Sequence, residues 1–247
     1  YILFSQVEFQ DFYKFYIINR KYNTPLFIMQ QGGGYGIHKF HTSYNHALKV
    51  CDYFLCFHKE YDKKHIRVPC PYFITYNNTS PKKNISIISQ SRLYFMHYKG
   101  VPEEQEVDIE FNFVNKIIDH LNNSVVKNVK IKTHLIFPSH HRTPYNISDG
   151  LEKYYYEKDL KFDFILSNSK LLINTYLGTS WYESIASNKP TILICKLDHH
   201  YFKKEFYPIF NEMVKLNLIF DDEKQLSTFI NNNSDYINDW YFSKDVQ

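Results

Sequence analysis

The feature that most constrains the fold is a strand–turn–helix–strand pattern over residues 171–194, LLINTYLGTSWYESIASNKPTILI. The apolar run at its start predicts a buried strand, and Gly178 permits a tight turn after that strand. Thr179 and Ser180 then open a predicted helix, and the run TILI returns as a second strand. A unit of this kind is typical of parallel α/β sheets.

The same alternation of strands and helices continues through the rest of the chain. Apolar runs predict strands at residues 24–30, 52–58, 84–90, 128–137, 171–176 and 190–195. Helical spacing of apolar residues predicts helices at residues 6–20, 42–51, 108–121 and 180–188, and a short helical piece between residue 162 and the strand that begins at 171. It also predicts a helix running into a strand over 204–220, and one or two helices within 222–242. We therefore expect an α/β fold with Rossmann-like, doubly wound parallel sheets, which bind ligands beyond the carboxyl ends of their strands.

A polar, turn-rich segment at residues 72–84 predicts a linker between two domains, which we place at residues 1–75 and 76–247. The chain has 247 residues, enough for one large core or two modest ones. Its formal net charge of +3 is too small to indicate nucleic-acid binding, and no apolar run is long enough to span a membrane. The four cysteines are not spaced as a zinc motif, and we expect reduced thiols and no metal.

The turn at Gly178 is the first candidate binding site. A Thr or Ser at the start of a helix can cap it, and Glu183 has the spacing of a capping box with Thr179 or Ser180. Thr175 stands at the end of the preceding strand. The free N–H groups and the helix dipole would make this turn an anion site. From the spacing alone, an ordinary capped helix and a phosphate site are equally open.

A second candidate lies on the predicted strand 128–137, in KIKTHLIFPSHHR. Lys132 and His134 are two residues apart, so their side chains share one face of the strand. A cation and an imidazole at the carboxyl end of a strand suit a diphosphate or a carboxylate, although a solvated strand end is the alternative. Arg92 and Arg142 are further cationic candidates for a substrate cleft.

The third candidate is the glycine loop, which we define as residues 31–36, QGGGYG. Four of the seven glycines of the chain lie in it, directly after a predicted buried strand. Glycine lets backbone amides approach a ligand closely and tolerates positive φ, and a purely structural turn would need only one or two glycines. We therefore assign Gln31, Gly32, Gly33, Gly34 and Tyr35 to the substrate cleft.

Two of these segments resemble a family of transferases of bacterial O-antigen and surface-polysaccharide synthesis. QQGGGYGIHKFHTSYNHALKVCDYFLCFH resembles the family's QHGGGYG segment, with Gln31 in place of the histidine. INTYLGTSWYESIASNKPTILICKLDHHYF resembles the later segment, in which Thr-x-x-Gly-Thr-x-x-x-Glu precedes NKPTI. YPIFNEMVKLNLIFDD continues the match, so the resemblance covers most of residues 2–239.

The resemblance implies a GT-B glycosyltransferase fold, with two Rossmann-like domains facing each other and no required metal or cofactor. Wider relatives, the bacterial Kdo and polysialic acid transferases, use CMP-sugars and hold the donor phosphate with Lys-x-His-Pro and Ser-Ser motifs. By this resemblance Lys132 and His134 would occupy the first motif, with Leu135 in place of the proline. Thr179 and Ser180 would occupy the second motif.

The resemblance also implies a division of labour along the chain. Residues 1–75 would be the end of an acceptor-side domain, so the chain is expected to be N-terminally truncated, and an inactive fragment is one interpretation of it. Residues 76–247 would bind the nucleotide-sugar. No catalytic residue is assigned, because the acceptor-side base or nucleophile of such enzymes usually lies in the N-terminal half.

The resulting function hypothesis is a metal-independent glycosyltransferase in lipopolysaccharide or O-antigen synthesis. It would move a sugar from a nucleotide-sugar, with a CMP-sugar favoured, to a glycan or lipid-linked acceptor. We expect a cytoplasmic protein with no nucleic-acid partner, and a peripheral contact with the inner face of the membrane is compatible with its charge. The alternatives are a glycerophosphate-type transferase and a non-catalytic domain that binds a glycan or a partner enzyme.

Overall fold

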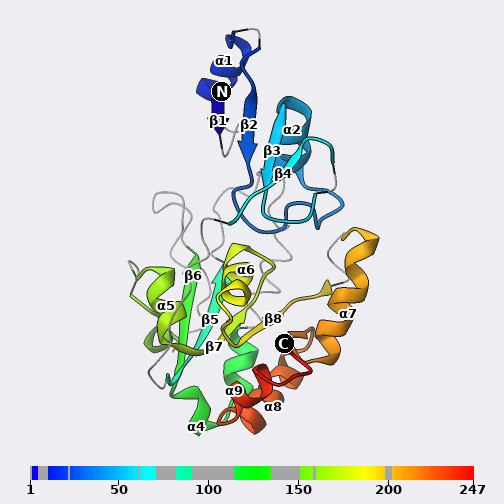
Figure 1. Ribbon diagram of the computed structural model, residues 1–247. Coiled ribbons are helices and arrows are strands. Elements are labelled where there is room, and N and C mark those ends of the chain that lie inside the picture. The colour runs from blue at the N-terminus through cyan, green and yellow to red at the C-terminus, as the bar shows by residue number, and fades with distance from the viewer. Residues whose placement is uncertain are drawn as a thin grey trace. The chain divides into compact units, whose positions relative to one another are not determined.

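The computed structural model describes residues 2–4, 11–21, 23–60, 62–70, 82–90, 114–134, 151–157, 160–197 and 202–247. The chain forms two compact units (Figure 1). The first comprises Tyr1–Tyr72 with His200–Phe206, and the second comprises Phe73–His199 with Tyr207–Gln247. The domain boundary expected at residue 75 falls within residues 71–81, outside the described part of the chain.

The first unit contains a four-stranded parallel sheet in the order β1-β2-β3-β4. Its strands are β1 (Ile2–Phe4), β2 (Leu26–Met29), β3 (Tyr53–Cys56) and β4 (His65–Arg67). Its helices are α1 (Asp11–Ile18) and α2 (Thr42–Val50), followed late in the chain by the 3₁₀ turn η3 (Lys204–Phe206). The apolar core of this sheet joins alternate strand residues to one face of α2: Leu26, Ile28, Phe54, Cys56, Tyr44 and Ala47.

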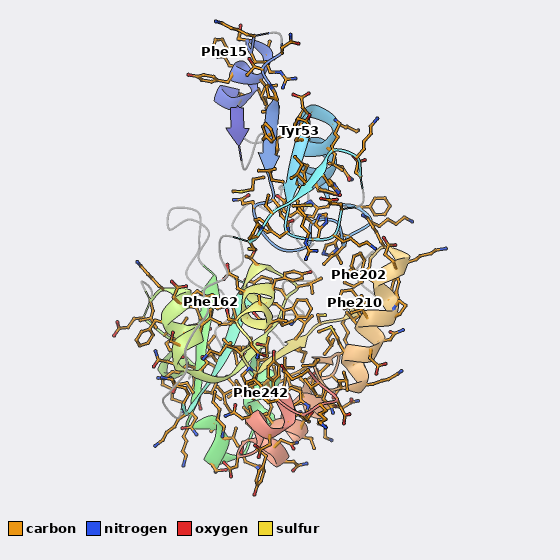
Figure 2. All side chains as sticks on the ribbon, in the orientation of Figure 1. Phe15, Tyr53, Phe162, Phe202, Phe210 and Phe242 are labelled. Atoms are coloured by element: carbon orange, nitrogen blue, oxygen red, sulfur yellow. The ribbon has the colours of Figure 1, made fainter. Side chains whose placement is uncertain are left out.

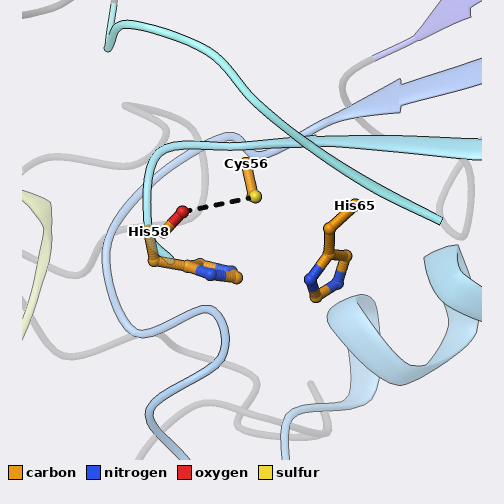
Figure 3. A group of neighbouring side chains, drawn as sticks. All are labelled: Cys56, His58 and His65. Carbon is orange, nitrogen blue, oxygen red and sulfur yellow. Dashed lines mark hydrogen bonds between the residues drawn. The ribbon is translucent and has the colours of Figure 1, made fainter. Parts of the chain in front are cut away.

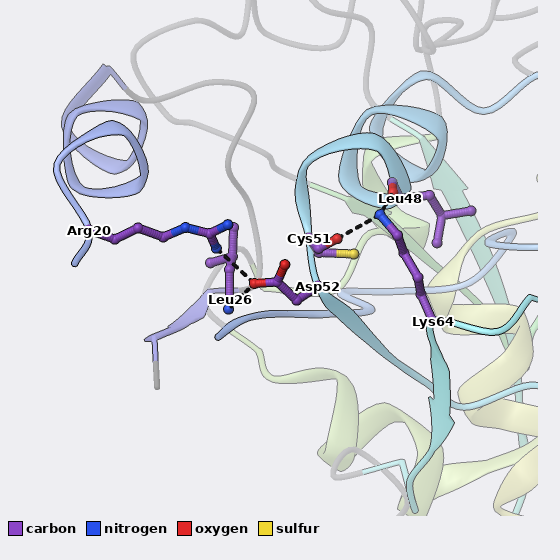
Figure 4. A network of polar contacts seen from close by, with 6 residues as sticks. All are labelled: Arg20, Leu26, Leu48, Cys51, Asp52 and Lys64. Carbon is purple, nitrogen blue, oxygen red and sulfur yellow. Dashed lines mark hydrogen bonds and ion pairs between the residues drawn. The ribbon is translucent and has the colours of Figure 1, made fainter. Parts of the chain in front are cut away.

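The carboxyl end of α2 is held by a lysine from the segment before β4 (Figure 4). The Lys64 ammonium donates to the carbonyl oxygens of Leu48 and Cys51, each at 2.7 Å. These carbonyls lie in the last turn of α2 and at its C-cap, where helical partners are missing and the dipole favours a cation. Lys64 therefore ends α2 and ties it to the start of β4.

A carboxylate fixes the start of β2 (Figure 4). Asp52 Oδ2 accepts a hydrogen bond of 2.8 Å from the backbone N–H of Leu26 and one of 2.9 Å from Arg20 Nη1. The backbone N–H of Asp52 in turn donates to the carbonyl of Leu26 at 3.0 Å. This reciprocal pair sets the register between the segment that enters β2 and the segment that enters β3.

The second unit contains a five-stranded parallel sheet in the order β6-β5-β7-β8-β9. Its strands are β5 (Asn84–Gln90), β6 (Val129–His134), β7 (Ser169–Asn174), β8 (Thr191–Ile194) and β9 (Ile219–Phe220). Its helices are α4 (Asn123–Val126), α5 (Phe162–Asn168), α6 (Thr179–Ala186), α7 (Tyr207–Lys215), α8 (Glu223–Asn233) and α9 (Ile237–Tyr241), with a further helix over residues 114–120 and the 3₁₀ turn η1 (Glu152–Tyr154).

Both faces of this sheet are covered. Ile85 and Ile87 of β5 belong to a large cluster with residues of the helix 114–120 and of α8, whereas Ile88 belongs to a second cluster with α5. Burial on both faces explains why β7 and β8 are buried along almost their whole length and contain the unbroken apolar runs LLI and ILI rather than an alternating pattern. The fold is thus the expected α/β class with doubly wound parallel sheets.

The predicted elements within the described residues are present, with shifted bounds. β1, β4 and α4 were not predicted, because three- and four-residue elements carry little periodic signal. The aromatic residues are divided between interior and surface (Figure 2). Phe202 and Phe210 are buried, whereas the side chain of Phe15 is 63% exposed. All four cysteines are free thiols, and among the described helices none has the length and hydropathy needed to cross a membrane.

Candidate functional site

The strand order of the second unit indicates where a ligand would bind. If the strands are numbered in chain order, from β5 as strand 1 to β9 as strand 5, their order across the sheet is 2-1-3-4-5. The chain adds β6 on one side of β5 and the later strands on the other side, so the strand order changes direction between β5 and β7. In open α/β sheets of this order, ligands bind outside the carboxyl ends of the strands at that reversal. β7 ends at Asn174, and the next residue, Thr175, donates its backbone N–H to the carbonyl of Ile88 in β5 at 3.0 Å. The reversal point therefore lies directly before the turn that leads into α6.

Asn174 is the most unusual residue at this point. It is fully buried, and its Oδ1 accepts a hydrogen bond of 2.9 Å from Ser180 Oγ in the first turn of α6. Its Nδ2 has no hydrogen-bond partner among the described residues. A buried amide donor without a partner costs about 1–3 kcal/mol of folding stability. A ligand atom that accepts a hydrogen bond from Asn174 Nδ2 would remove this cost.

The amino terminus of α6 lacks a side-chain cap. The N-cap is Gly178, in extended conformation, and it provides no side-chain hydrogen bond. The predicted capping box is therefore wrong: Thr179 is already the first helical residue, and the Ser180 hydroxyl turns back to Asn174 instead of capping. Gly178 is required for another reason, since a Cβ there would collide with the Tyr176 ring. A helix start without a cap leaves the positive end of the dipole accessible to an anion.

Glu183 lies one turn further along α6, on the same side as Ser180. Burial, with a smaller contribution from the negative charge of Asp163, raises the pKa of Glu183 to about 7. At neutral pH its carboxyl group is thus close to half protonated and can accept or donate a hydrogen bond. Such a group suits the hydroxyls of a ribose or a sugar better than a second phosphate.

Lys132 lies on β6, which pairs with β5 on the side opposite to β7. Ile88 of β5 pairs with Lys132 of β6 on one side and with Asn174 of β7 on the other. Residues in register across parallel strands share a face, so Lys132 and Asn174 lie on one face about 10 Å apart, the width of two strand spacings. Lys132 is half-buried. This span matches a ligand that carries more than one polar group.

Other predicted residues of this site are placed differently or not described. Thr175 is buried, and its hydroxyl donates to the Ile88 carbonyl at 3.4 Å. The backbone of His134 ends β6, level with Gln90, but its side chain lies outside the described part. Arg92 and Arg142 fall in residues 91–113 and 135–150, which the structure does not describe. Their assignment stays a prediction.

In the first unit, the glycine loop is anchored by a residue that the sequence did not single out. The Gln30 side chain is buried, and its amide donates to the carbonyl of Gly32 at 2.7 Å while its Oε1 accepts from the Phe57 backbone N–H at 2.9 Å. Gln30 thus joins the glycine loop to the segment after β3. Gln31, in contrast, is exposed.

The remainder of the glycine loop combines left-handed backbone with aromatic packing. Gly34 and Gly36 have φ of 83° and 78°, values that favour glycine. Tyr35 lies between them in the sequence, and its ring contacts the rings of His41 and Phe54, with centroid distances of 4.3 and 6.1 Å. Tyr35 therefore anchors the loop to the core of this unit, and the expected substrate contact of Gln31, Gly32, Gly33, Gly34 and Tyr35 stays a prediction.

Asn174 and Gln30 could have been found from the sequence only by position. Asn174 is the one polar residue in the apolar run LLIN at the end of β7, and Gln30 is the first polar residue after LFIM. A polar residue that ends a buried strand in a parallel sheet stands where ligands bind. Without the backbone, nothing in the sequence indicates that either side chain is buried.

Comparison with known proteins agrees with this architecture. A family model described as LIC12162 family transferase matches residues 2–247. The chain belongs to this family of transferases. A comparison with curated proteins gave no significant match.

Among solved structures, three forms of the wall teichoic acid polymerase TagF are similar to this LIC12162 family transferase. Two are variants, with TM-scores of 0.55 and 0.51 at 10% and 9% identity, covering 92% of this chain. The third is a variant after a 15 minute soak with CDPG, with a TM-score of 0.50 at 10% identity. This chain spans 63%, 63% and 62% of the three TagF chains, so it corresponds to less than two thirds of their length. At this level of identity the similarity shows the fold, which is GT-B-like.

Proposed function

We propose that this transferase moves a sugar from a nucleotide-sugar, with a CMP-sugar favoured, to a lipopolysaccharide, O-antigen or other surface-glycan acceptor. Its second unit binds the donor, and the reaction requires no metal and no cofactor. The membership of a transferase family and the GT-B-like fold support the reaction class. The nucleotide, the sugar and the acceptor are proposed from the chemistry of the site and from the resemblance in the sequence.

The observation that carries the proposal is Asn174 Nδ2, which has no hydrogen-bond partner in the described part of the chain and lies beside the uncapped start of α6. When a CMP-linked donor breaks, the departing phosphate takes up negative charge. Fixed donors that point at this charge stabilise the transition state more than the ground state, and this stabilisation often contributes more to catalysis than any other effect. Asn174 Nδ2 and the first N–H groups of α6 would serve as these donors, and Lys132 would neutralise the remaining charge.

The remaining predicted residues have separate roles. The Ser180 hydroxyl holds the Asn174 amide in place through the 2.9 Å hydrogen bond, and can rotate toward a phosphate when one is bound. The Glu183 carboxyl group would form hydrogen bonds with the hydroxyl groups of the donor ribose. The glycine loop of the first unit would offer its backbone N–H groups to the substrate.

A second candidate, transfer of a glycerophosphate-type group, is favoured by the similarity to TagF, a wall teichoic acid polymerase with a CDPG-soaked form. A CDP-linked alcohol and a CMP-sugar both release CMP, so both donors need the same stabilised leaving phosphate. They differ in the bond that breaks, which is a pyrophosphate bond in the first and a bond from a sugar carbon to the phosphate in the second. Mass analysis of the transferred group therefore separates the two reactions.

The first test measures nucleotide binding by calorimetry and by the thermal shift with CMP, CDP, UDP and GDP, each with and without magnesium. A ligand at 100 times its Kd adds about 2.7 kcal/mol of stability, which is readily seen. We expect CMP or CDP to bind equally well with and without magnesium. Failure of all four nucleotides to bind would refute the donor site, and stabilisation by a glycan alone would favour the non-catalytic binding domain.

The matched variant is Asn174→Asp. It keeps the shape of the side chain and an oxygen to accept from Ser180, but replaces the free donor by an acidic group. We expect nucleotide affinity to fall at least tenfold, about 1.4 kcal/mol. The control is Ser227→Ala, which removes another buried helical hydroxyl, one bonded to the carbonyls of Ile117 and Glu223. Equal nucleotide affinity in Asn174→Asp and the wild type would remove Asn174 from the site.

A cytoplasmic location, with a peripheral contact at the inner face of the membrane, is part of the same proposal because nucleotide-linked donors are made in the cytoplasm. The net charge of +3 would support only a weak attraction to anionic lipids. Sedimentation with vesicles of anionic and of neutral lipids measures this contact. Binding that is equal for both vesicle types would show that charge does not drive it.

A further inference from the structure

Three side chains that can bind metals gather in the first unit, where β3 ends and β4 begins (Figure 3). Cys56 is the last residue of β3, His58 follows two residues later, and His65 is the first residue of β4. The Sγ of Cys56 and one nitrogen of each imidazole all lie within 4.8 Å of one another. Cys56 and His65 are buried and His58 is half-buried.

The hydrogen bonds of the two histidines determine which nitrogen of each ring carries a lone pair. His58 Nδ1 lies 2.6 Å from the carbonyl oxygen of Lys59, which can only accept, so Nδ1 carries the proton and Nε2 the lone pair. His65 Nδ1 accepts from the backbone N–H of Asp62 at 3.2 Å, so its Nε2 carries the proton and donates to Tyr44 Oη at 2.9 Å. Both rings are thus held as neutral imidazoles of defined tautomer.

This arrangement has the form of a metal site with its supporting shell. Metal-binding histidines usually donate the other ring N–H to an oxygen acceptor, which orients the ring and fixes the tautomer. Here the Lys59 carbonyl accepts the hydrogen bond from His58, and the Tyr44 hydroxyl oxygen accepts the one from His65. When the metal binds, His65 Nδ1 would coordinate it and would no longer accept the long hydrogen bond from the Asp62 backbone N–H.

We propose that Cys56, His58 and His65 form a binding site for a divalent transition-metal ion of the zinc class. One thiolate and two imidazoles suit zinc, which binds sulfur at about 2.3 Å and nitrogen at about 2.0–2.1 Å, and a water molecule would complete the tetrahedron. Those bond lengths place neighbouring ligand atoms about 3.3–3.6 Å apart. Side chains separated by up to 4.8 Å therefore need to close by about 1 Å when the ion binds.

The ion would act as a structural cross-link and not as part of the proposed transfer. It would join β3, β4 and the segment between them, residues 57–64, which connects two parallel strands in fewer residues than the dozen of a usual crossover. The ring of His58 also lies against the glycine loop, because a Cβ on Gly36 would be 2.8 Å from His58 Nε2. Fixing His58 would therefore also limit the movement of the glycine loop.

The test is a titration of the metal-free protein with Co²⁺, followed by competition with Zn²⁺. We expect one Co²⁺ per chain, with a thiolate-to-cobalt charge-transfer band and the intense visible bands of tetrahedral cobalt. Zn²⁺ should displace the cobalt, and at 100 times its Kd it should raise the Tm by about 5–10 °C. Absence of the charge-transfer band in the wild type would overturn the proposal without any variant.

Two variants with matched controls locate the site. Cys56→Ser should lose the charge-transfer band, whereas Cys51→Ser, which removes another buried thiol of the same unit, should keep it. Tyr44→Phe removes only the oxygen that orients His65 and should weaken Zn²⁺ binding about 10–100-fold. Its control is Tyr53→Phe on the exposed side of β3. A band that survives in Cys56→Ser, or equal affinity in Tyr44→Phe and the wild type, would refute this ligand set.

Discussion

Replacing Glu183 by Gln should make the protein more stable at pH 8 and leave its stability unchanged at about pH 4.5. Burial and the charge of Asp163 raise the pKa of Glu183 to about 7 from its ordinary value of 4.5. Between these two values the folded state holds a proton that the unfolded state has released, so the stability from this group falls as pH rises. The contribution is fully present below about pH 4.5 and is lost by about pH 7.

The size of the effect follows from the width of this pH window. A difference of about 2.5 pH units corresponds to about 3.4 kcal/mol for a fully buried group. Glu183 is only half-buried, so solvent screens the charge and we expect about 1–2 kcal/mol. Gln has the shape of the protonated carboxyl group but does not titrate. Glu183→Gln should therefore gain this amount over the wild type at pH 8.

The assay is urea denaturation of both proteins at half-unit steps from pH 4.5 to 8.5, with the difference in unfolding free energy plotted against pH. Subtracting the wild type removes the titration of the other groups. Glu212→Gln, on the exposed surface of α7, is the control for replacing a carboxylate by an amide. A flat difference for Glu183→Gln, or a loss of stability at pH 8, would refute the assigned environment. Asp163→Asn should reduce the slope, because it removes the second cause of the shift.

Three further perturbations test other parts of the fold by urea denaturation. Lys189→Met should stabilise the protein by about 1–3 kcal/mol at pH 7, because the buried ammonium has no hydrogen-bond partner among the described residues. Burial lowers the pKa of Lys189, so this gain should shrink as the pH approaches about 10.4, and a gain independent of pH would contradict this cause. Gly36→Ala should destabilise by about 1–2 kcal/mol or more, since its φ of 78° disfavours a side chain and His58 occupies the space; an unchanged midpoint would show that the loop adapts freely. Asp52→Ala should cost about 1–2 kcal/mol by leaving the Leu26 N–H without its carboxylate, and a cost near zero would indicate that water replaces it.

Much of the fold was predictable because its signals are local. The unit over residues 171–194 contains a buried strand, a glycine turn and an amphipathic helix, and each is visible within a dozen residues. Parallel pairing follows from the alternation of strands and helices. The short strands β1 and β4 were missed because three residues carry no period.

The chemistry of the site was less predictable because it depends on contacts that cross elements. The sequence offered Thr179 or Ser180 as a cap of α6 or as part of a phosphate site, but the Ser180 hydroxyl donates to Asn174 at the end of the preceding strand. Which partner a side-chain hydroxyl at a helix start binds depends on the tertiary structure around it. Residue spacing in the sequence does not reveal that structure. The Cys56, His58 and His65 cluster likewise arises only when β4 pairs with β3.

The segment 202–206 limits where this chain can be cut into separate domains. Phe202 pairs with His38 in an isolated antiparallel bridge, and the backbone N–H of Lys203 donates to the Ile37 carbonyl at 2.9 Å. The first unit is therefore discontinuous in sequence, and its late segment follows β8 of the second unit. A fragment ending at residue 72 would lose the Phe202 ring, whose centroid lies 5.2 Å from that of the His38 ring. Domain exchange between relatives would have to transplant both pieces together.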